Sequence, residues 1–213
     1  MGLVETIPLP TIEDYLAMEE TSHEKHEYVD GVIRAMSGGT RMHSRIKVNL
    51  IAELSQRLRG SSCKPYDCDY RISIPGRRSY LYPDASVICG PVEVDKKDKN
   101  AATNPTVIFE VLSPSSESYD RRRKIFLYRQ CATLRDFVLI DYDLPVVEVY
   151  HRDDAGQWLH IAYTDLATVA QIKSIDIELP LSAIYEDVEF PPPEKSNTTI
   201  VREEGAMYFA DQP

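Results

Sequence analysis

The 213-residue sequence has few cysteines, no closely spaced cysteine pair and no long apolar run. Its four cysteines contain no CxxC pair, and its five histidines supply no paired ligands either, which argues against a zinc site. We also expect no disulfide framework in a chain of this size, and we interpret the cysteines as small apolar residues. No stretch approaches the roughly 18 consecutive apolar residues that a membrane-spanning helix needs. The cysteines are Cys63, Cys68, Cys89 and Cys131.

Positive charge is also scarce, because 34 acidic residues outnumber 24 lysines and arginines and give a net charge of −10. A globally acidic surface repels nucleic-acid phosphates. The basic residues nevertheless cluster, as in the run from Arg121 to Lys124, so a basic face on an acidic body stays open. The segment Met1–Pro10 lacks the cationic start of a secretion signal, and we therefore expect a cytoplasmic protein.

Two helices and a hairpin are predicted in the first third of the chain. Thr11 followed by Asp14 is typical of a capped helix start. Asp30-Gly31 lies between two apolar-containing runs and predicts a hairpin. From about Arg41 to Leu58 apolar residues recur at steps of four, which indicates an amphipathic helix.

Strands dominate the prediction for the rest of the chain. The run Thr106–Leu112 is almost continuously apolar, as expected for a strand that is buried on both faces. Asp120 to about Cys131 is predicted as a helix, and Pro91–Pro105 as an exposed polar loop. Further strands are predicted at Tyr70–Ile74, Ala85–Cys89, Asp136–Asp141, Val146–Tyr150 and, at a sheet edge, Trp158–Tyr163.

This order of elements predicts one α/β domain with a mixed sheet flanked by helices. A chain of this length can bury one sizeable core, whereas two full domains would be cramped. We place the domain at residues 1–187. Residues 188–213 are proline-rich and acidic, with too few apolar residues for a core of their own, and we interpret them as a tail.

Two carboxylates have unusual places in this pattern. Glu110 lies within an otherwise apolar strand, where a carboxylate is costly unless it is paired or binds a cation. Asp84 follows a proline at the start of another short apolar strand. Together they could form an oxygen-ligand site for Mg²⁺ or Mn²⁺ that activates water for hydrolysis. The alternative is structural: Glu110 pairs with an arginine inside the sheet and Asp84 caps a turn.

An ordered set of motifs resembles a known family. Tyr82-Pro83-Asp84 is followed by the segment Glu110–Ser115, then by Tyr119-Asp120 and Lys124. This set resembles the Uma family of bacterial restriction-endonuclease-like proteins, which belongs to the PD-(D/E)xK nuclease superfamily. The likeness runs from about Tyr15 to Tyr185 and includes Glu27-Tyr28-Val29-Asp30-Gly31 and His43.

The resemblance implies a restriction-endonuclease-like fold, with a mixed sheet of four to five strands and helices on both sides. It also implies divalent-metal-dependent hydrolysis of phosphodiester bonds. Asp84 and Glu110 match the acidic metal ligands of the family, and the backbone carbonyl of Val111 would complete the coordination.

One position departs from the superfamily pattern. The motif lysine lies two residues after the glutamate, on the same face of the strand, but this sequence has Leu112 there. The nearest replacement is Lys124 on the following helix, where the family also keeps a lysine, and Asp120 one turn earlier could orient it. The alternative is that Lys124 belongs to a solvated basic stretch without a catalytic role.

Further site residues are proposed with their alternatives. Glu27 is a third acidic candidate, since a residue from the N-terminal region often joins the metal site in this superfamily; otherwise it is an exposed strand glutamate. His43 could contact phosphate or assist a water molecule, although a lone histidine at a helix start is more often a surface or capping residue. Arg41, Arg121 and Arg122 are candidates for contacts with the DNA backbone.

The leading hypothesis is a metal-dependent endonuclease that acts on DNA, with Asp84, Glu110, Lys124 and Glu27 in the site. The resemblance further implies a homodimer that cuts both strands. Two alternatives stay open. One is an inactive nuclease-fold protein that binds nucleic acid or protein, which the missing strand lysine and the acidic charge favour. The other is a metal-dependent hydrolase with a different substrate, since a fold does not fix the substrate.

Overall fold

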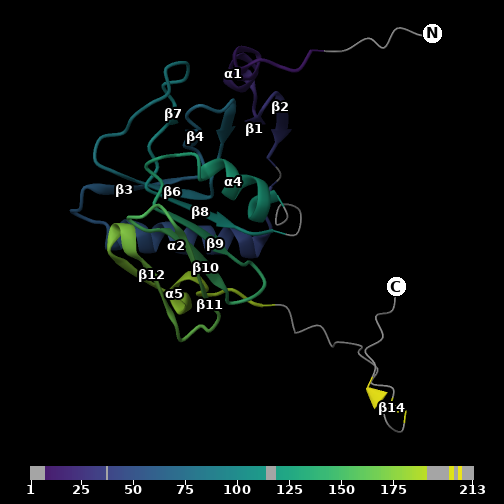
Figure 1. Cartoon of the computed structure of the whole chain (residues 1–213), viewed down its shortest axis with the longest axis vertical. Coiled ribbons are helices and arrows are strands. Elements are labelled where there is room, and N and C mark those ends of the chain that lie inside the picture. Colours follow the sequence, from purple (N-terminus) through teal and green to yellow (C-terminus); the bar gives the residue numbers. More distant parts are fainter. Residues whose placement is uncertain (1–7, 37, 114–118, 191–201, 204–205, 208–213) are drawn as a thin grey trace.

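The computed structural model describes residues 8–36, 38–113, 119–190, 202–203 and 206–207 (Figure 1). Two main sheets organise these residues. The large sheet contains β3 (Cys63–Asp67), β6 (Ala85–Cys89), β8 (Val107–Val111), β9 (Asp136–Ile140), β10 (Val147–Arg152) and β11 (Trp158–Tyr163). The small sheet contains β1 (His26–Val29), β2 (Val32–Ala35), β4 (Arg71–Ser73), β5 (Ser79–Leu81) and β7 (Ala101–Ala102).

The large sheet is mixed, which confirms the predicted fold class. Its strand order is β11-β10-β9-β8-β6-β3, with a parallel β8–β9 pair and antiparallel neighbours elsewhere. It has six strands rather than the four to five that the resemblance implied. The small sheet, in the order β2-β1-β5-β4-β7, was not predicted as a separate sheet, because its strands have only two to four residues and carry a weak local signal.

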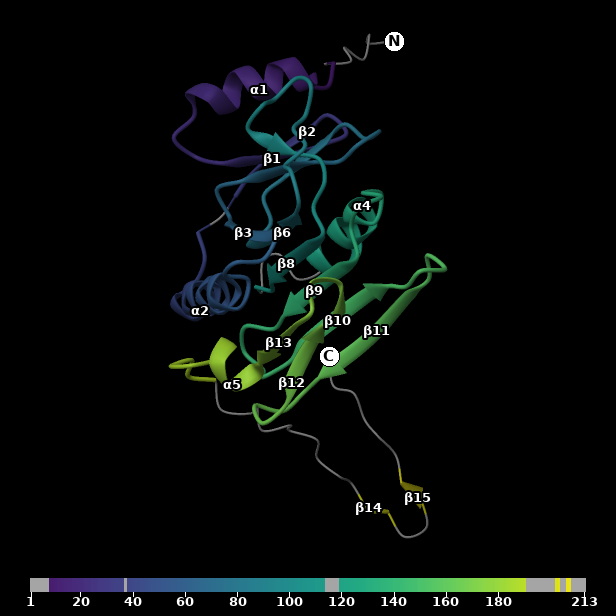
Figure 2. The same cartoon turned by 90° about the vertical axis from the view of Figure 1, so that its left-hand side faces the viewer.

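Helices cover both faces of the large sheet. α2 (Arg41–Arg57) lies across one face, and the segment of η1 (Asp120–Lys124) and α4 (Ile125–Tyr128) lies on the other (Figure 2). The remaining elements are α1 (Ile12–Thr21), η2 (Lys173–Ile175), α5 (Leu181–Ile184), and the strand pairs β12 (Val169–Ile172) with β13 (Ile177–Pro180) and β14 (Arg202–Glu203) with β15 (Ala206–Met207).

Local sequence signals account for the early elements as predicted. Thr11 and Asp14 form a reciprocal capping box at the start of α1. The turn between β1 and β2 places Asp30 and Gly31 at positive φ, the conformation that an Asp-Gly hairpin turn requires. In α2, the predicted stripe at Ile46, Leu50 and Leu54 is fully buried.

The alternation of β8 separates two apolar clusters. Val107, Phe109 and Val111 face α2, whereas Ile108 and Leu112 face α4. All five residues of β8 are buried, as predicted for a strand covered on both faces. Glu110 shares the parity of Ile108 and Leu112, so its carboxylate lies on the α4 face of the sheet.

Three predictions of local structure were wrong. The Pro91–Pro105 segment is not uniformly exposed, because β7 and the residues Asp98 and Asn104 are buried. Asp98 forms an ion pair with Arg71, and Asn104 forms hydrogen bonds with the loop backbone. The predicted helix at Asp120 begins with a π-helical turn and ends at Tyr128 rather than Cys131. Finally, a disulfide is present.

The disulfide joins Cys63 in β3 to Cys89 in β6. These cysteines are 26 residues apart, and antiparallel pairing makes them direct register partners at the edge of the large sheet. Only the strand pairing brings them together, so cysteine spacing could not reveal it. Among the described cysteines, Cys68 and Cys131 are not disulfide-bonded.

The predicted tail at 188–213 lies largely outside the described residues. Of its first positions, Val188 and Phe190 pack against the apolar cluster that faces α2. None of the helices in the described ranges is both long and apolar enough to cross a lipid bilayer.

Candidate metal-dependent active site

The carboxylate of Glu110 is almost fully enclosed, with 2% of the residue exposed. The ammonium of Lys124 lies 3.1 Å from Oε1 of Glu110, and the Tyr128 hydroxyl donates to the same oxygen at 3.3 Å. Burial raises the pKa of Glu110 well above its ordinary value, and the negative charges of Asp120, Asp84 and Glu27 raise it further against the opposing charge of Lys124. The structural alternative, in which Glu110 pairs with an arginine, is therefore wrong, because Lys124 and Tyr128 are its partners.

Lys124 is the centre of a group of three carboxylates. Its Nζ lies 3.1 Å from Glu27 Oε1, 3.1 Å from Glu110 Oε1 and 3.3 Å from Asp120 Oδ1. Only 8% of its side chain is exposed, so the interpretation of Lys124 as part of a solvated stretch was wrong. Burial opposes its charge, but the three carboxylates outweigh burial and raise the pKa of Lys124 well above its ordinary value.

The π-helical turn η1 directs this lysine inward. Asp120 and Lys124 are buried in η1, whereas Arg122 and Arg123 between them are exposed. Asp120 and Lys124 form an i,i+4 ion pair, which is the pairing that the sequence suggested. Leu112, at the superfamily's lysine position, is buried in the apolar cluster that faces α4. Lys124 therefore supplies the positive charge beside Glu110 that the strand lacks.

Asp84 stands at the junction of the two sheets, between β5 and β6. Its Oδ2 accepts a 2.8 Å hydrogen bond from the backbone N–H of Val111, and its Oδ1 lies 3.3 Å from Nζ of Lys47. Burial opposes ionisation of Asp84, but His43, Lys47 and Lys124 outweigh it and hold its pKa below the ordinary value. Asp84 thus ties β8 to the site rather than only capping a turn.

His43 and Glu27 are both buried, contrary to the exposed alternatives that the sequence left open. The His43 ring lies 3.0 Å from the Val111 carbonyl through Nε2, which must be the donor, and 3.4 Å from Asp84 Oδ2. Its Nδ1 is buried and has no hydrogen-bond partner among the described residues. Glu27, in β1, accepts a long 3.4 Å bond from the Tyr82 N–H in addition to its pair with Lys124.

These groups line one cavity of about 280 Å³. Its polar lining brings together Glu27, His43, Lys47, Asp84, Glu110, Asp120 and Lys124, from β1, α2, the β5–β6 link, β8 and η1. Both sheets and both helical layers therefore contribute to one site. Four carboxylates stand against two ammonium groups and the exposed guanidinium of Arg34, so these groups, when all are ionised, have an excess of one negative charge.

The donor set fits a hard divalent cation. Asp84, Glu110 and the Val111 carbonyl offer oxygen ligands within the cavity, and Mg²⁺ commonly takes one or two carboxylates and completes its shell with water or substrate oxygens. No cluster of three or more His, Cys, Asp or Glu side chains within the described ranges is arranged to hold a metal by itself. The backbone carbonyl and exogenous oxygens would therefore have to complete the shell.

The arginines predicted for DNA contacts do not line this cavity. Exposed Arg41 pairs with Glu189 at 3.2 Å. Arg121 pairs closely with Glu148 and lies 3.9 Å from Asp141, which directs its charge toward β9 and β10. Arg122 is exposed on η1.

Lys47 is a cavity residue that the sequence did not single out as part of the site. It lies one turn after His43 on α2, and both side chains reach Asp84. The only sequence signal for Lys47 was its i,i+4 spacing from His43, a residue of the family resemblance. Such pairs occur in any amphipathic helix, so the spacing alone does not predict a site residue. Tyr128 packs in the core, and its hydroxyl also contacts Glu110.

Comparisons with known proteins agree with this architecture. Residues 12–182 match the Uma2 family, whose description is "Putative restriction endonuclease". Two uncharacterized proteins of Synechocystis sp. are similar: one is 38% identical over 185 residues, covering 86% of this chain and 96% of the relative, and the other is 33% identical over 159 residues, covering 75% and 90%. A crystal structure from Anabaena variabilis, titled as a "putative nuclease belonging to DUF820", superposes with a TM-score of 0.69 at 17% identity, covering 83% of this chain and 97% of that one.

Proposed function

The chain belongs to the Uma2 family, and from that premise we propose that it is a nuclease that hydrolyses DNA phosphodiester bonds with Mg²⁺ or Mn²⁺. The observation that carries the proposal is the convergence of Asp84 and Glu110 with Lys124 on one cavity. An excess of buried carboxylates over ammonium groups costs free energy, and a bound cation would remove that cost.

Asp84, Glu110 and the Val111 carbonyl are the groups that would hold the ion. A divalent ion in such a site lowers the pKa of a bound water and neutralises negative charge on the phosphoryl group. The chain's own residues prepare this arrangement. Val111 N–H and His43 fix the orientation of Asp84, while Lys124 holds Glu110 and Glu27 against their mutual repulsion.

In the proposed hydrolysis, a water oxygen attacks phosphorus as one bridging P–O bond breaks. The positive charge of Lys124, 3.1 Å from Glu110, would offset the negative charge that grows in the transition state. Glu27, held by the same ammonium, would support the site. We retain Arg41, Arg122, Arg121 and His43 as candidates for DNA contacts, of which only His43 lines the cavity. A homodimer and a cytoplasmic location remain part of the proposal.

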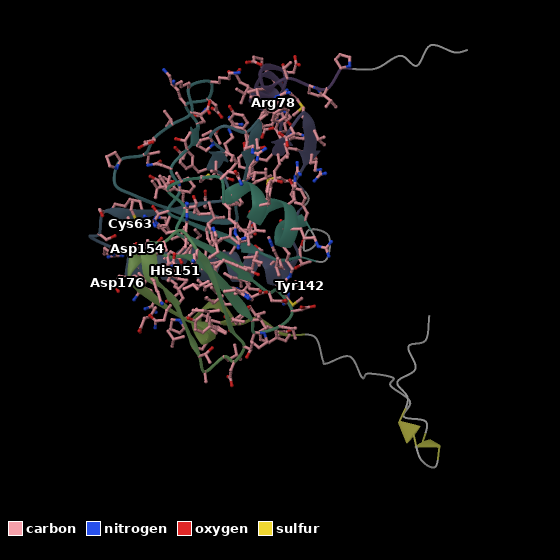
Figure 3. All side chains as sticks on the ribbon, in the orientation of Figure 1. Cys63, Arg78, Tyr142, His151, Asp154 and Asp176 are labelled. Carbon is pink, nitrogen blue, oxygen red and sulfur yellow. A yellow bond between two sulfur atoms is a disulfide. The ribbon has the colours of Figure 1, made fainter. Side chains whose placement is uncertain are left out.

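The first test is calorimetric titration of Mn²⁺ and Mg²⁺ into the wild type, Asp84→Ala and Glu110→Ala. Asp154→Ala is the matched control, because Asp154 is an exposed acid in the β10–β11 turn (Figure 3). We expect binding in the wild type and the control and none in the two site variants. Metal-dependent nicking of supercoiled plasmid DNA should show the same pattern.

Metal binding that survives both site substitutions would contradict the proposed ligands. No binding at millimolar metal in the wild type would instead favour the alternative of a nuclease-fold protein that binds without catalysis. The absence of a strand lysine at Leu112 is the observation that favours that alternative. Metal binding together with inertness toward all DNA would point to another phosphodiester or hydrolytic substrate.

A further inference from the structure

The two lysines of the cavity are held very differently. Lys124 is surrounded by Glu27, Glu110 and Asp120 and is almost wholly buried. Among the described residues Lys47 has one carboxylate partner, Asp84, and 26% of its side chain is exposed. An ammonium fixed by three carboxylates is poorly placed to leave them for a substrate phosphate, whereas one that is paired with a single carboxylate can move at lower cost.

The two oxygens of Asp84 are also unequal. Oδ2 is fixed by the Val111 backbone N–H at 2.8 Å, with the His43 ring nearby at 3.4 Å. Among the described residues, the ion-pair partner of Oδ1 is the Lys47 ammonium at 3.3 Å. A backbone donor cannot be removed without disturbing β8, whereas a lysine side chain can swing away. Oδ1 is therefore the more accessible oxygen of Asp84 for a cation, which would compete there with Lys47.

We propose that Lys47 is an exchangeable cation. Without metal, its ammonium pairs with Oδ1 of Asp84; when a metal binds Oδ1, Lys47 is released and contacts the scissile phosphate. The inference rests on the proposed nuclease function and extends it to Lys47, which is not part of the motifs that resemble the family. It also assigns the role of the missing strand lysine to two residues. Lys124 neutralises the carboxylates at the floor of the site, and Lys47 faces the substrate.

The surroundings of Lys47 favour such an exchange. Besides Asp84, its Nζ contacts the sulfur of Cys68 at 3.8 Å, a weak acceptor that holds the ammonium only loosely. Lys47 lines the same cavity as Glu110, so a Lys47 ammonium displaced from Oδ1 would keep its charge within the cavity that a substrate phosphate would enter. Metal binding and phosphate binding are thereby coupled through one side chain.

The first arm of the test measures Mn²⁺ affinity by calorimetry without DNA, for the wild type, Lys47→Met, Lys47→Arg and Lys173→Met. Lys173 is the matched control: it is an exposed lysine in η2, next to Ser174 and at the opposite end of β9 from the site. Removal of the competing ammonium should tighten Mn²⁺ binding by roughly three- to tenfold in Lys47→Met. Lys47→Arg, which keeps the charge, and Lys173→Met should bind Mn²⁺ like the wild type.

The second arm measures binding of a mixed-sequence duplex oligonucleotide by fluorescence anisotropy, in Ca²⁺ to prevent cleavage and in EDTA. With Ca²⁺ present, Lys47 is displaced toward the phosphate, so Lys47→Met should weaken DNA binding by about tenfold. In EDTA the ammonium stays on Asp84, and the same variant should bind DNA within about twofold of the wild type. Lys173→Met should show no metal-dependent difference.

The two arms separate the failure of this inference from the failure of the proposed function. Unchanged or weaker Mn²⁺ binding in Lys47→Met, alongside normal binding in the wild type, overturns the exchange and leaves the metal site intact. Equal losses of DNA binding in Ca²⁺ and EDTA overturn it as well, because Lys47 would then be an ordinary basic contact. Absence of Mn²⁺ binding in every protein overturns both proposals. If Lys47→Met does not fold, Lys47→Arg is tested in its place. Wild-type Mn²⁺ affinity together with DNA binding that changes in Ca²⁺ but not in EDTA supports the exchange. DNA binding that is unchanged in both conditions overturns it.

Discussion

Two buried carboxylates lie on the neighbouring central strands of the large sheet, Glu110 near the end of β8 and Asp136 at the start of β9. Asp136 is fully enclosed. His151 Nδ1 lies 2.7 Å from its Oδ1, and Ser174 bonds its Oδ2 through both the backbone N–H, at 3.1 Å, and the hydroxyl. Figure 3 labels His151 and Tyr142 on opposite sides of the view; Tyr142 follows the end of β9 that is opposite to Asp136.

The carboxylates of Asp136 and Glu110 differ in the number of hydrogen-bond and ion-pair donors that are available to each. Asp136 has the His151 ring at Oδ1 and the Ser174 backbone N–H and hydroxyl at Oδ2, and no other carboxylate among the described residues shares these bonds. Glu110 shares the single ammonium of Lys124 with Glu27 and Asp120, and a cavity adjoins it. A buried carboxylate with sufficient donors stabilises the fold, whereas one that competes for donors beside a cavity is suited to bind a cation.

The largest expected effect is on catalysis at the Glu110 end. Glu110→Gln and Asp84→Asn keep the shape of each side chain but remove the charge that would hold the metal. We expect DNA cleavage to fall by about 10³-fold or more. The unfolding midpoint of Glu110→Gln should change little, because Glu27 and Asp120 still surround Lys124. A wild-type cleavage rate in either variant would contradict the proposed role of that carboxylate in holding the metal.

Asp136→Asn should have the opposite outcome. The amide cannot accept all the bonds from Ser174 and His151, and we expect the free energy of unfolding to fall by about 2 kcal/mol, as measured by urea denaturation. Mn²⁺ affinity should stay at the wild-type value, because Asp136 does not line the cavity. Loss of metal binding without loss of stability would contradict a structural role for Asp136 that is distinct from the metal-binding role of Glu110.

The pH dependence of metal binding should reflect the protonation of Glu110. Burial and the neighbouring carboxylates raise the pKa of Glu110, so below that pKa a metal must displace its proton. Mn²⁺ affinity should therefore increase by about tenfold per pH unit and level off above the raised pKa. Calorimetry in buffers of different ionisation enthalpy should detect about one proton released per metal. A flat profile from mildly acidic to neutral pH would contradict this assignment.

The smallest expected effect concerns the support of His43. A Cβ at Gly39 would lie 2.4 Å from His43 Nδ1, so Gly39→Ala must push the ring away from Val111 and Asp84. We expect Mn²⁺ affinity to fall by roughly three- to tenfold. Gly38→Ala is the matched control, because a Cβ there meets no atom within 4 Å. Equal effects of both substitutions would show that loop rigidity, and not the His43 ring, matters.

The sequence predicted the parts of this molecule that depend on neighbours along the chain. The step-of-four stripe of α2, the Asp-Gly hairpin and the buried strand around Glu110 are local patterns with fixed periods, and the structure confirms them. The fold class followed from their order and from the family resemblance. The motif residues also mark Asp84, Glu110 and Lys124 as candidate site residues.

The tertiary structure decided which charges meet. Whether Arg121 or Lys124 turns inward depends on a π-helical turn, and the pairing of Arg121 with Glu148 depends on a strand 27 residues away. Lys47 gains its place only because α2 packs on the sheet beside Asp84, and Cys63 meets Cys89 only through strand register. Hydrophobic periodicity is encoded locally, but the partner of a buried charge is set by long-range packing.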